Sequence, residues 1–209
     1  MHLATRLCAF AALASACGVA CSSSDQSIGV PASAGSGTSS AGSGMSSAGS
    51  GTSSAGSGSG DTEPAAQQGM TAAHNAARAA VMPAATPAIP PLGWSAELAA
   101  TAQAWAAGCK FQHSGGKYGE DLYASAGQAV TPQAVVDSWV GEAKDYDYAA
   151  NSCSGVCGHY TQVVWRDSAK LGCGVTNCST NSPFNGFPDW QIWVCNYDPP
   201  GNFNGKKPY

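Results

Sequence analysis

The 209-residue chain has 9 Lys and Arg against 13 Asp and Glu, which gives a formal net charge of −4. So few basic residues form no stripe that could neutralise phosphates, and we expect no nucleic-acid partner. A stretch near the start is so poor in large apolar side chains that we expect only one domain of ordinary size, present as a monomer.

The N-terminus is typical of an export signal. Arg6 precedes the apolar run 7–20, which is too short to cross a bilayer as a helix, so we interpret residues 1–21 as a signal peptide. Cys17 and Cys21 each follow small residues and resemble the lipidated cysteine of a bacterial lipobox, and Cys21 fits the length of the run better. The alternative is an ordinary secretory peptide with incidental cysteines. Either way we expect an extracellular or cell-envelope protein, and lipidation would anchor it in a membrane, such as a bacterial outer membrane.

Residues 22–69 are interpreted as a disordered linker. Within them, residues 33–60 repeat the unit Ser-Ala-Gly-Ser-Gly-Xaa-Ser almost four times. The repeat lacks the large apolar side chains that the a and d positions of a coiled coil need. A chain of this composition is a flexible coil.

Three helices are predicted after the linker, within a domain at 70–209. Thr71 is a candidate cap for a helix over 72–81, and Ser95 for a second over 96–107. A third helix begins with Thr131 as cap and Pro132 at the first helical position, and continues to about Lys144.

Strand patterns follow the helices. Residues 171–176 and 190–195 are short, rich in β-branched and aromatic side chains, and bounded by Gly, Asn and Pro clusters. Helices first and strands later indicate an α+β domain in which helices pack on a mostly antiparallel sheet.

Six cysteines remain outside the leader, and an even number in an exported domain predicts three disulfides. The alternative, free thiols or a zinc cluster, is disfavoured because the spacings do not make two close pairs. Counting alone does not choose among the pairings. The six are Cys109, Cys153, Cys157, Cys173, Cys178 and Cys195.

Two segments carry a family resemblance. Residues 158–165, Gly-His-Tyr-Thr-Gln-Val-Val-Trp, resemble the first signature of the CAP superfamily, and residues 195–203, Cys-Asn-Tyr-Asp-Pro-Pro-Gly-Asn-Phe, resemble the second. The Tyr-Asp-Tyr at 146–148 and the ending at 207–209 are similar to the plant pathogenesis-related 1 branch of that superfamily.

The resemblance implies an α-β-α sandwich with a central cleft. It places four residues in the cleft: His113, Glu120, Glu142 and His159. It also implies the disulfide pairs Cys109 with Cys178, Cys153 with Cys157, and Cys173 with Cys195. This chain departs from the family at Asp121, where Asn is usual, and in the short loop between Cys153 and Cys157.

The implied cleft suggests a metal site. Two neutral imidazoles, His113 and His159, are suited to a divalent transition ion, and carboxylates can orient them through the second ring nitrogen. We expect zinc, bound weakly and exchangeably, because a catalytic zinc site usually has three protein ligands.

Three functions stay open at this point. The favoured one is a non-enzymatic binding module with a lipid or sterol ligand, since some CAP relatives bind such molecules. A secreted hydrolase is disfavoured because Ser114 lacks the setting of a nucleophile and the domain cysteines are assigned to disulfides. The third is a passive surface protein with an antimicrobial or signalling role. His74 is interpreted as a helix contact.

Overall fold

The computed structural model describes residues 61–127 and 129–209. The predicted leader, the lipidation candidates Cys17 and Cys21, and the repeats of the linker lie outside the described residues. Within the described ranges, no helix combines the length and the apolar character that crossing a membrane requires.

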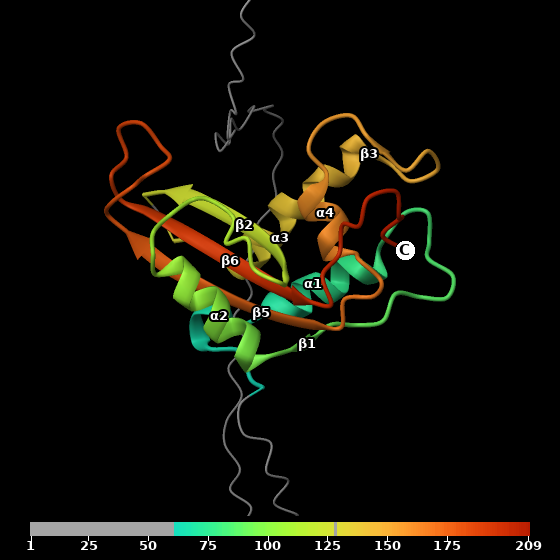
Figure 1. The fold of residues 1–209 in the computed structure, drawn as a ribbon, viewed down its shortest axis with the longest axis horizontal. Helices are drawn as coiled ribbons and strands as arrows, with labels where there is room; N and C mark the ends of the chain where they lie inside the picture. The colour runs from blue at the N-terminus through green and yellow to red at the C-terminus, as the bar shows by residue number, and fades with distance from the viewer. Residues whose placement is uncertain (1–60, 128) are drawn as a thin grey trace, which may run out of the picture. The chain divides into compact units, whose positions relative to one another are not determined.

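A four-stranded sheet forms the centre of the domain (Figure 1). Its strand order is β1-β5-β6-β2; β1 runs parallel to β5 and the other pairs are antiparallel. The strands are β1 (Gly93–Trp94), β2 (Gly119–Ala126), β5 (Lys170–Cys178) and β6 (Trp190–Asp198). A separate short ribbon pairs β3 (Tyr146–Asp147) with β4 (Ser152–Cys153).

Helices cover both faces of this sheet. Alternate residues of β6 belong to two different cores, because successive side chains of a strand point to opposite faces. One core contains Trp193, Cys195 and Tyr197 of β6 and side chains from α1 (Met70–Ala79), α3 (Pro132–Val140) and α4 (Gly158–Val163). The other core contains Ile192 and Val194 of β6 and side chains from α2 (Ala96–Ala106). The predicted α+β class and α-β-α sandwich are confirmed.

Helix α2 lies directly on the backbone of β5. A Cβ atom at Gly172 would come within 2.2 Å of Ala99 N, and one at Gly174 within 2.4 Å of the Gln103 backbone. Only glycine permits this approach, so these two residues set how closely the helix packs on the sheet.

The start of the domain differs from the prediction. Helix α1 begins at Met70 with Gly69 as its N-cap, so the prediction of Thr71 as cap is wrong. The Glu63 carboxylate accepts from the backbone N–H groups of Gly69 and Thr71, which supplies the negative charge that a helix N-terminus favours. The linker prediction is also wrong for residues 61–69, since Ala65–Gln67 form a 3-10 helix and Gln67 is buried.

The other predicted helices have the expected caps. The side chain of Ser95 accepts from Leu98 N at 3.4 Å, and that of Thr131 accepts from Ala134 N at 3.2 Å. Helix α3 ends at Val140, and the remainder of the predicted stretch is a 3-10 helix, η2 (Gly141–Asp145). The two predicted strands are present and are longer than their β-rich cores.

A buried arginine joins three parts of the fold. Arg78, on α1, is 1% exposed. Its guanidinium donates to the carbonyl oxygens of Pro90 (2.8 Å), Val163 (3.0 Å), Trp165 (2.7 Å) and Ser168 (3.1 Å). Burial lowers the pKa of Arg78 to about 10, which leaves it charged at neutral pH. The side chain therefore fastens α1 to the end of α4 and to the segment before β1.

All three disulfide pairings implied by the family resemblance are confirmed: Cys109–Cys178, Cys153–Cys157 and Cys173–Cys195. Cys173 and Cys195 are opposite each other in the β5–β6 register and both are buried. Cys109–Cys178 joins the end of α2 to the end of β5 across a sequence separation of 69. The first of these bridges therefore lies within the sheet, and the second fastens the α2 layer to it.

The disulfides should differ in their contribution to stability. Replacing both Cys173 and Cys195 with Ala should lower the free energy of unfolding by about 2–5 kcal/mol, because the bridge closes a loop and lies in the core. Replacing both Cys153 and Cys157 should cost less, since that bridge has a sequence separation of only 4. Denaturant unfolding of both double variants measures the difference, and equal losses would contradict this ranking.

Candidate functional site

The first histidine–carboxylate pair joins the loop after α2 to strand β2. His113 Nδ1 lies 2.9 Å from Glu120 Oε1, and Ser114 N donates to the same oxygen at 2.8 Å. The imidazole is 64% exposed, whereas the Glu120 side chain is only 7% exposed. The carboxylate is thus buried behind a ring that faces solvent.

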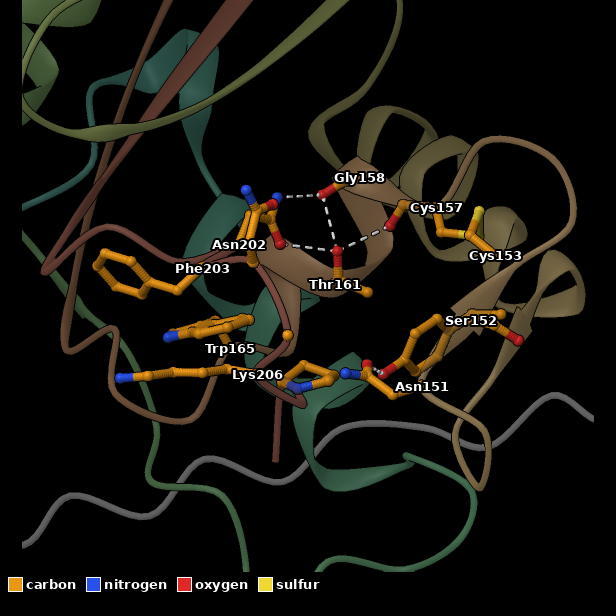
Figure 2. Close-up of a pocket in the computed structure, with 14 residues that line it drawn as sticks. Asn151, Ser152, Cys153, Cys157, Gly158, Thr161, Trp165, Asn202, Phe203 and Lys206 are labelled. Atoms are coloured by element: carbon orange, nitrogen blue, oxygen red, sulfur yellow. Dashed lines mark hydrogen bonds between the residues drawn. A yellow bond between two sulfur atoms is a disulfide. The ribbon is translucent and has the colours of Figure 1, made fainter.

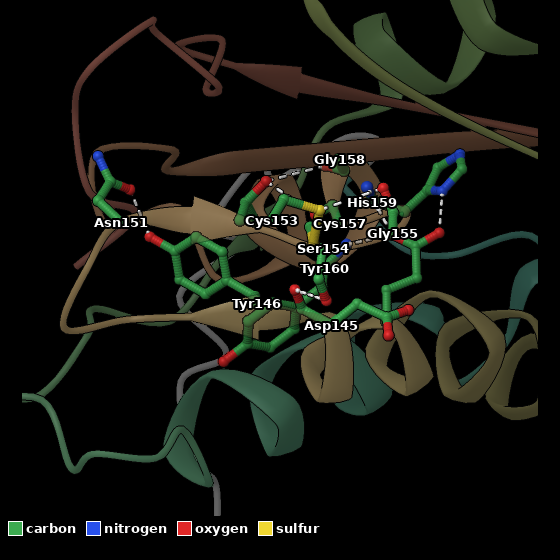
Figure 3. Close-up of a disulfide and its surroundings, with 12 residues drawn as sticks. Asp145, Tyr146, Asn151, Cys153, Ser154, Gly155, Cys157, Gly158, His159 and Tyr160 are labelled. Carbon is green, nitrogen blue, oxygen red and sulfur yellow. Dashed lines mark hydrogen bonds and ion pairs between the residues drawn. A yellow bond between two sulfur atoms is a disulfide. The ribbon is translucent and has the colours of Figure 1, made fainter.

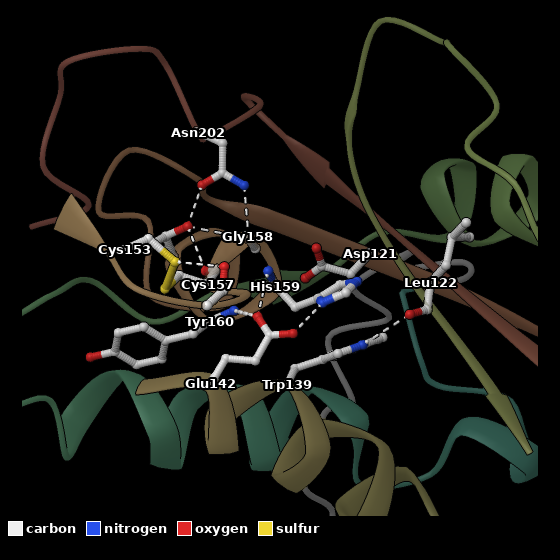
Figure 4. Close-up of polar contacts among 12 residues, drawn as sticks. Asp121, Leu122, Trp139, Glu142, Cys153, Cys157, Gly158, His159, Tyr160 and Asn202 are labelled. Carbon is white, nitrogen blue, oxygen red and sulfur yellow. Dashed lines mark hydrogen bonds and ion pairs between the residues drawn. A yellow bond between two sulfur atoms is a disulfide. The ribbon is translucent and has the colours of Figure 1, made fainter. Parts of the chain in front are cut away.

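The second pair joins η2 to α4 (Figure 4). His159 Nδ1 lies 2.6 Å from Glu142 Oε1, and Glu142 Oε2 accepts from the backbone N–H groups of His159 and Tyr160 at 3.0 and 3.2 Å. Trp139 stacks on the imidazole with ring centroids 6.1 Å apart, and its Nε1 donates to Leu122 O. Glu142 therefore holds the ring and the first turn of α4 together.

A short covalent loop positions α4 for this contact. Figure 3 shows the Cys153–Cys157 disulfide beside Asp145, the last residue of η2. Ser154 N donates to Asp145 O at 2.9 Å, and α4 begins immediately after Cys157. Although the loop between Cys153 and Cys157 is shorter than is usual in the family that the sequence resembles, it still places His159 against Glu142.

Two adjacent residues of β2 lie next to the two histidines, one beside each. Glu120 contacts His113, while the adjacent Asp121 points to the other face and lies beside the His159 ring (Figure 4). Burial disfavours the charged form of His159, but the hydrogen bond with Glu142 and the charge of that carboxylate oppose it, and the pKa of His159 is raised.

Asp121 belongs to a buried polar chain. Tyr197 Oη lies 2.8 Å from Asp121 Oδ2 and 2.9 Å from His74 Nε2, and His74 Nδ1 lies 2.8 Å from Met70 O. Burial, partly offset by His159 and Tyr197, raises the pKa of Asp121 to about 8. Burial likewise lowers the pKa of His74 to about 4, so this imidazole is neutral.

The number of protons available to these three hydrogen bonds favours a protonated Asp121. A carbonyl only accepts, so the single proton of neutral His74 is on Nδ1, facing Met70 O. Tyr197 then has one proton for two contacts. If Tyr197 donates it to an ionised Asp121, His74 Nε2 is left without a donor. A protonated Asp121 supplies the missing proton, which agrees with its raised pKa.

Two hollows adjoin the site. One, of about 260 Å³, is lined by His113, Ser114, Tyr118, Glu120 and Gln162 together with residues 200–202, and His159 is not among its lining residues. A neighbouring hollow of about 350 Å³ lies between the C-terminal segment and the start of α4 (Figure 2). There Asn202 Nδ2 donates to Gly158 O at 2.8 Å and Asn202 Oδ1 accepts from Thr161 at 2.7 Å.

The structure pairs each predicted histidine with one of the predicted carboxylates, His113 with Glu120 and His159 with Glu142. In residues 61–127 and 129–209, no group of three His, Cys, Asp or Glu side chains is arranged to hold a metal ion. His74 is a buried helix contact, as interpreted from sequence. The sequence did not predict that Asp121 is buried or that Tyr197 bonds to it. The one available signal was the departure from the family, in which Asn is usual at position 121.

Comparison with known proteins places this arrangement in a family. The model of the CAP, or cysteine-rich secretory protein, family matches residues 71–197. The chain belongs to the CAP family. The CAP domain is similar to pathogenesis-related protein 1 of Arabidopsis thaliana, with 42% identity over 68% of this chain and 82% of that protein. It is also 47% identical to pathogenesis-related leaf protein 4 of Solanum lycopersicum, over 68% of this chain and 82% of that protein.

Solved structures share the fold of this CAP protein. Schistosoma mansoni venom allergen-like protein 4 is 27% identical, with a TM-score of 0.54, and the match covers 70% of this chain and 95% of that chain. The crystal structure of NaASP2 with Zn²⁺ is 25% identical, with a TM-score of 0.56, covering 72% and 88% of the two chains. The secretory family and the disulfides agree with an extracellular location.

Proposed function

We propose that this CAP protein is an extracellular, non-enzymatic binding module in which His113 and His159 hold a weak, exchangeable zinc ion. The observation that carries the proposal is the orientation of the two imidazoles. Each directs Nδ1 at a carboxylate, Glu120 or Glu142. Among the described residues, neither Nε2 atom takes part in a hydrogen bond.

These pairs fit the chemistry of a zinc ligand. A metal-binding histidine generally donates its other ring N–H to a carboxylate, which fixes the tautomer and leaves the second nitrogen free to bind the ion. With two protein ligands, water would complete the coordination, so affinity should be low. The similar chain NaASP2, whose crystal structure was solved with Zn²⁺, supports this choice of metal.

The same geometry gives little support to a hydrolase. The Ser114 hydroxyl accepts from Gly116 N at 3.2 Å, and His113, the adjacent imidazole, is paired with Glu120. The six cysteines of the domain are in disulfides, which removes thiolate nucleophiles. A binding role needs no such nucleophile. The proposed place of action is the cell envelope, with the chain held by a lipid on Cys21.

Calorimetric titration of the metal-free protein with zinc tests the site. We expect one weak binding event, lost in His113→Ala and in His159→Ala, and weakened about 10–100-fold in Glu120→Gln or Glu142→Gln. Binding should fade as pH falls, because a protonated imidazole has no lone pair to donate. Since the pKa of His159 is raised, the loss should begin at a higher pH than for an ordinary histidine.

Asp137→Asn is the matched control, because this carboxylate is exposed on α3 and contacts Gln133 rather than the histidines. It should bind zinc as the unmodified protein does. If both histidine variants bind zinc normally, the assignment fails, and the four residues are a hydrogen-bonded network that shapes the surface.

A further inference from the structure

The hollow between the C-terminal segment and the start of α4 has the features of a second binding site (Figure 2). Its volume of about 350 Å³ is within the usual range for small-molecule sites, and neither His113 nor His159 lines it. Its wall combines aromatic rings with uncharged polar side chains. The amide and hydroxyl side chains of the wall are those of Asn151, Ser152, Thr161, Asn202 and Asn204.

Internal hydrogen bonds fix part of this polar wall and leave one amide donor free. Asn202 is fixed, since its side chain donates to Gly158 O at 2.8 Å and accepts from Thr161 Oγ1 at 2.7 Å. Asn151 Oδ1 accepts from Tyr146 Oη at 2.6 Å, which orients the amide. Asn151 Nδ2 is accessible to solvent and has no hydrogen-bond partner in the described part of the chain. The wall therefore offers an oriented donor to a ligand.

An exposed aromatic ring and a cation lie together at the same hollow. The Phe203 side chain is 50% exposed and packs at a tilt on the buried Trp165, with ring centroids 6.0 Å apart. Lys206 Nζ lies 5.2 Å from the centre of the Phe203 ring. Among the described residues that line the hollow, Lys206 is the one charged side chain, and it forms no ion pair with any of them.

We propose that this hollow binds a short oligosaccharide whose sugar units carry carboxylates, as uronic acids do. A pyranose ring has C–H groups on its faces, which can pack on the Phe203 ring. Its hydroxyl groups both donate and accept, so they can pair with Asn151 Nδ2 and with the amide of Asn204 and the hydroxyl of Ser152. A sugar carboxylate accepts from the Lys206 ammonium in a charge-assisted hydrogen bond.

The same wall is poorly suited to two other common classes of ligand. A hydrocarbon chain or ring system would cover the amide and hydroxyl groups without giving them partners, which is unfavourable. A chain of phosphates would need several cations, whereas Lys206 supplies a single positive charge. Many uncharged polar groups, one exposed ring and one cation together favour a polyhydroxylated ligand that carries a carboxylate.

Calorimetric titration of the purified full-length protein with tri-galacturonate and tri-mannuronate tests the site. We expect at least one of them to bind, and the neutral trisaccharide of the same sugar configuration and linkage to bind about tenfold more weakly. Phe203→Ala removes the ring, and Asn151→Asp removes the donor but keeps the oxygen that accepts from Tyr146, so each should weaken binding about tenfold. Lys206→Gln should abolish the preference for the acidic trisaccharide over the neutral one.

Two matched controls should bind the acidic trisaccharide normally. Lys207→Gln changes the adjacent lysine, which contacts Ala149 O and does not line the hollow, and Phe111→Ala removes an exposed ring elsewhere. Melting curves should verify that each variant is folded. Adding EDTA should change nothing, which separates this site from the proposed zinc site. The proposal is overturned if neither acidic trisaccharide binds, if the neutral one binds as tightly, or if Phe203→Ala and Asn151→Asp both bind like the unmodified protein.

Discussion

Arg78→Ala should lower the free energy of unfolding by at least about 4 kcal/mol and leave little folded protein. The change removes every hydrogen bond of a buried guanidinium and leaves the carbonyls of Pro90, Val163 and Ser168 without their donor. Each unsatisfied carbonyl costs about 1–3 kcal/mol. Because the free energy of unfolding of a domain is only about 5–15 kcal/mol, this loss removes much of it. The yield of soluble protein and its denaturant midpoint measure this.

Two further variants make the result specific. Arg166→Ala removes a guanidinium that donates to the carbonyls of Pro87 and Ala88 near the surface, and should cost under about 1 kcal/mol. Arg78→Lys keeps the charge but loses the planar fork that reaches several carbonyls at once, so it should fall between the two. An Arg78→Ala domain that melts like the unmodified protein would refute the role assigned to this side chain.

Asp121→Asn should stabilise the domain at neutral pH by about 4 kcal/mol. In the folded state the pKa of Asp121 is raised to about 8 from its ordinary 3.8, chiefly by burial. The folded chain therefore keeps a proton that the unfolded chain releases. The contribution of Asp121 to stability is full below about pH 4, falls as pH rises, and is lost as pH passes through about 8. An asparagine amide can donate to Tyr197 without taking up a proton, so it avoids this loss.

Unfolding by denaturant at pH 4, 6 and 8 measures the effect. The difference between Asp121→Asn and the unmodified protein should be smallest at pH 4 and largest at pH 8. Asp137→Asn, an exposed substitution, should show no such trend. A difference that stays constant from pH 4 to pH 8 would mean that Asp121 keeps an ordinary pKa in the folded domain.

Local sequence patterns predicted those parts of the fold that depend on local physics. Ser95 and Thr131 cap their helices through contacts within three residues. The strand β2 was not predicted, because Gly119, Glu120 and Asp121 have low β propensity and the strand exists through its pairing with β6. The true start of α1 depends on Glu63, which acts from outside the helix.

The candidate site was likewise predicted only in part. The family resemblance supplied the two histidines and two glutamates, and each histidine contacts one of those glutamates. The buried state of Asp121 and its contact with Tyr197 arise only when β2 lies beside β6. Apart from the departure from the family at position 121, no local pattern carries that information, since alternation along a strand is visible only once the strand is recognised.

The order of the strands bears on how the domain is made. β6, which pairs with both β5 and β2, is the last strand in the sequence, and His74 and Tyr197 are 123 positions apart. Contacts this distant in sequence are associated with slow folding, in milliseconds to seconds. During synthesis, β2 and β5 are complete while the strand between them is still missing, so both present open edges that can pair with other chains. A chain cut short before Trp190 should therefore aggregate rather than form a smaller stable domain.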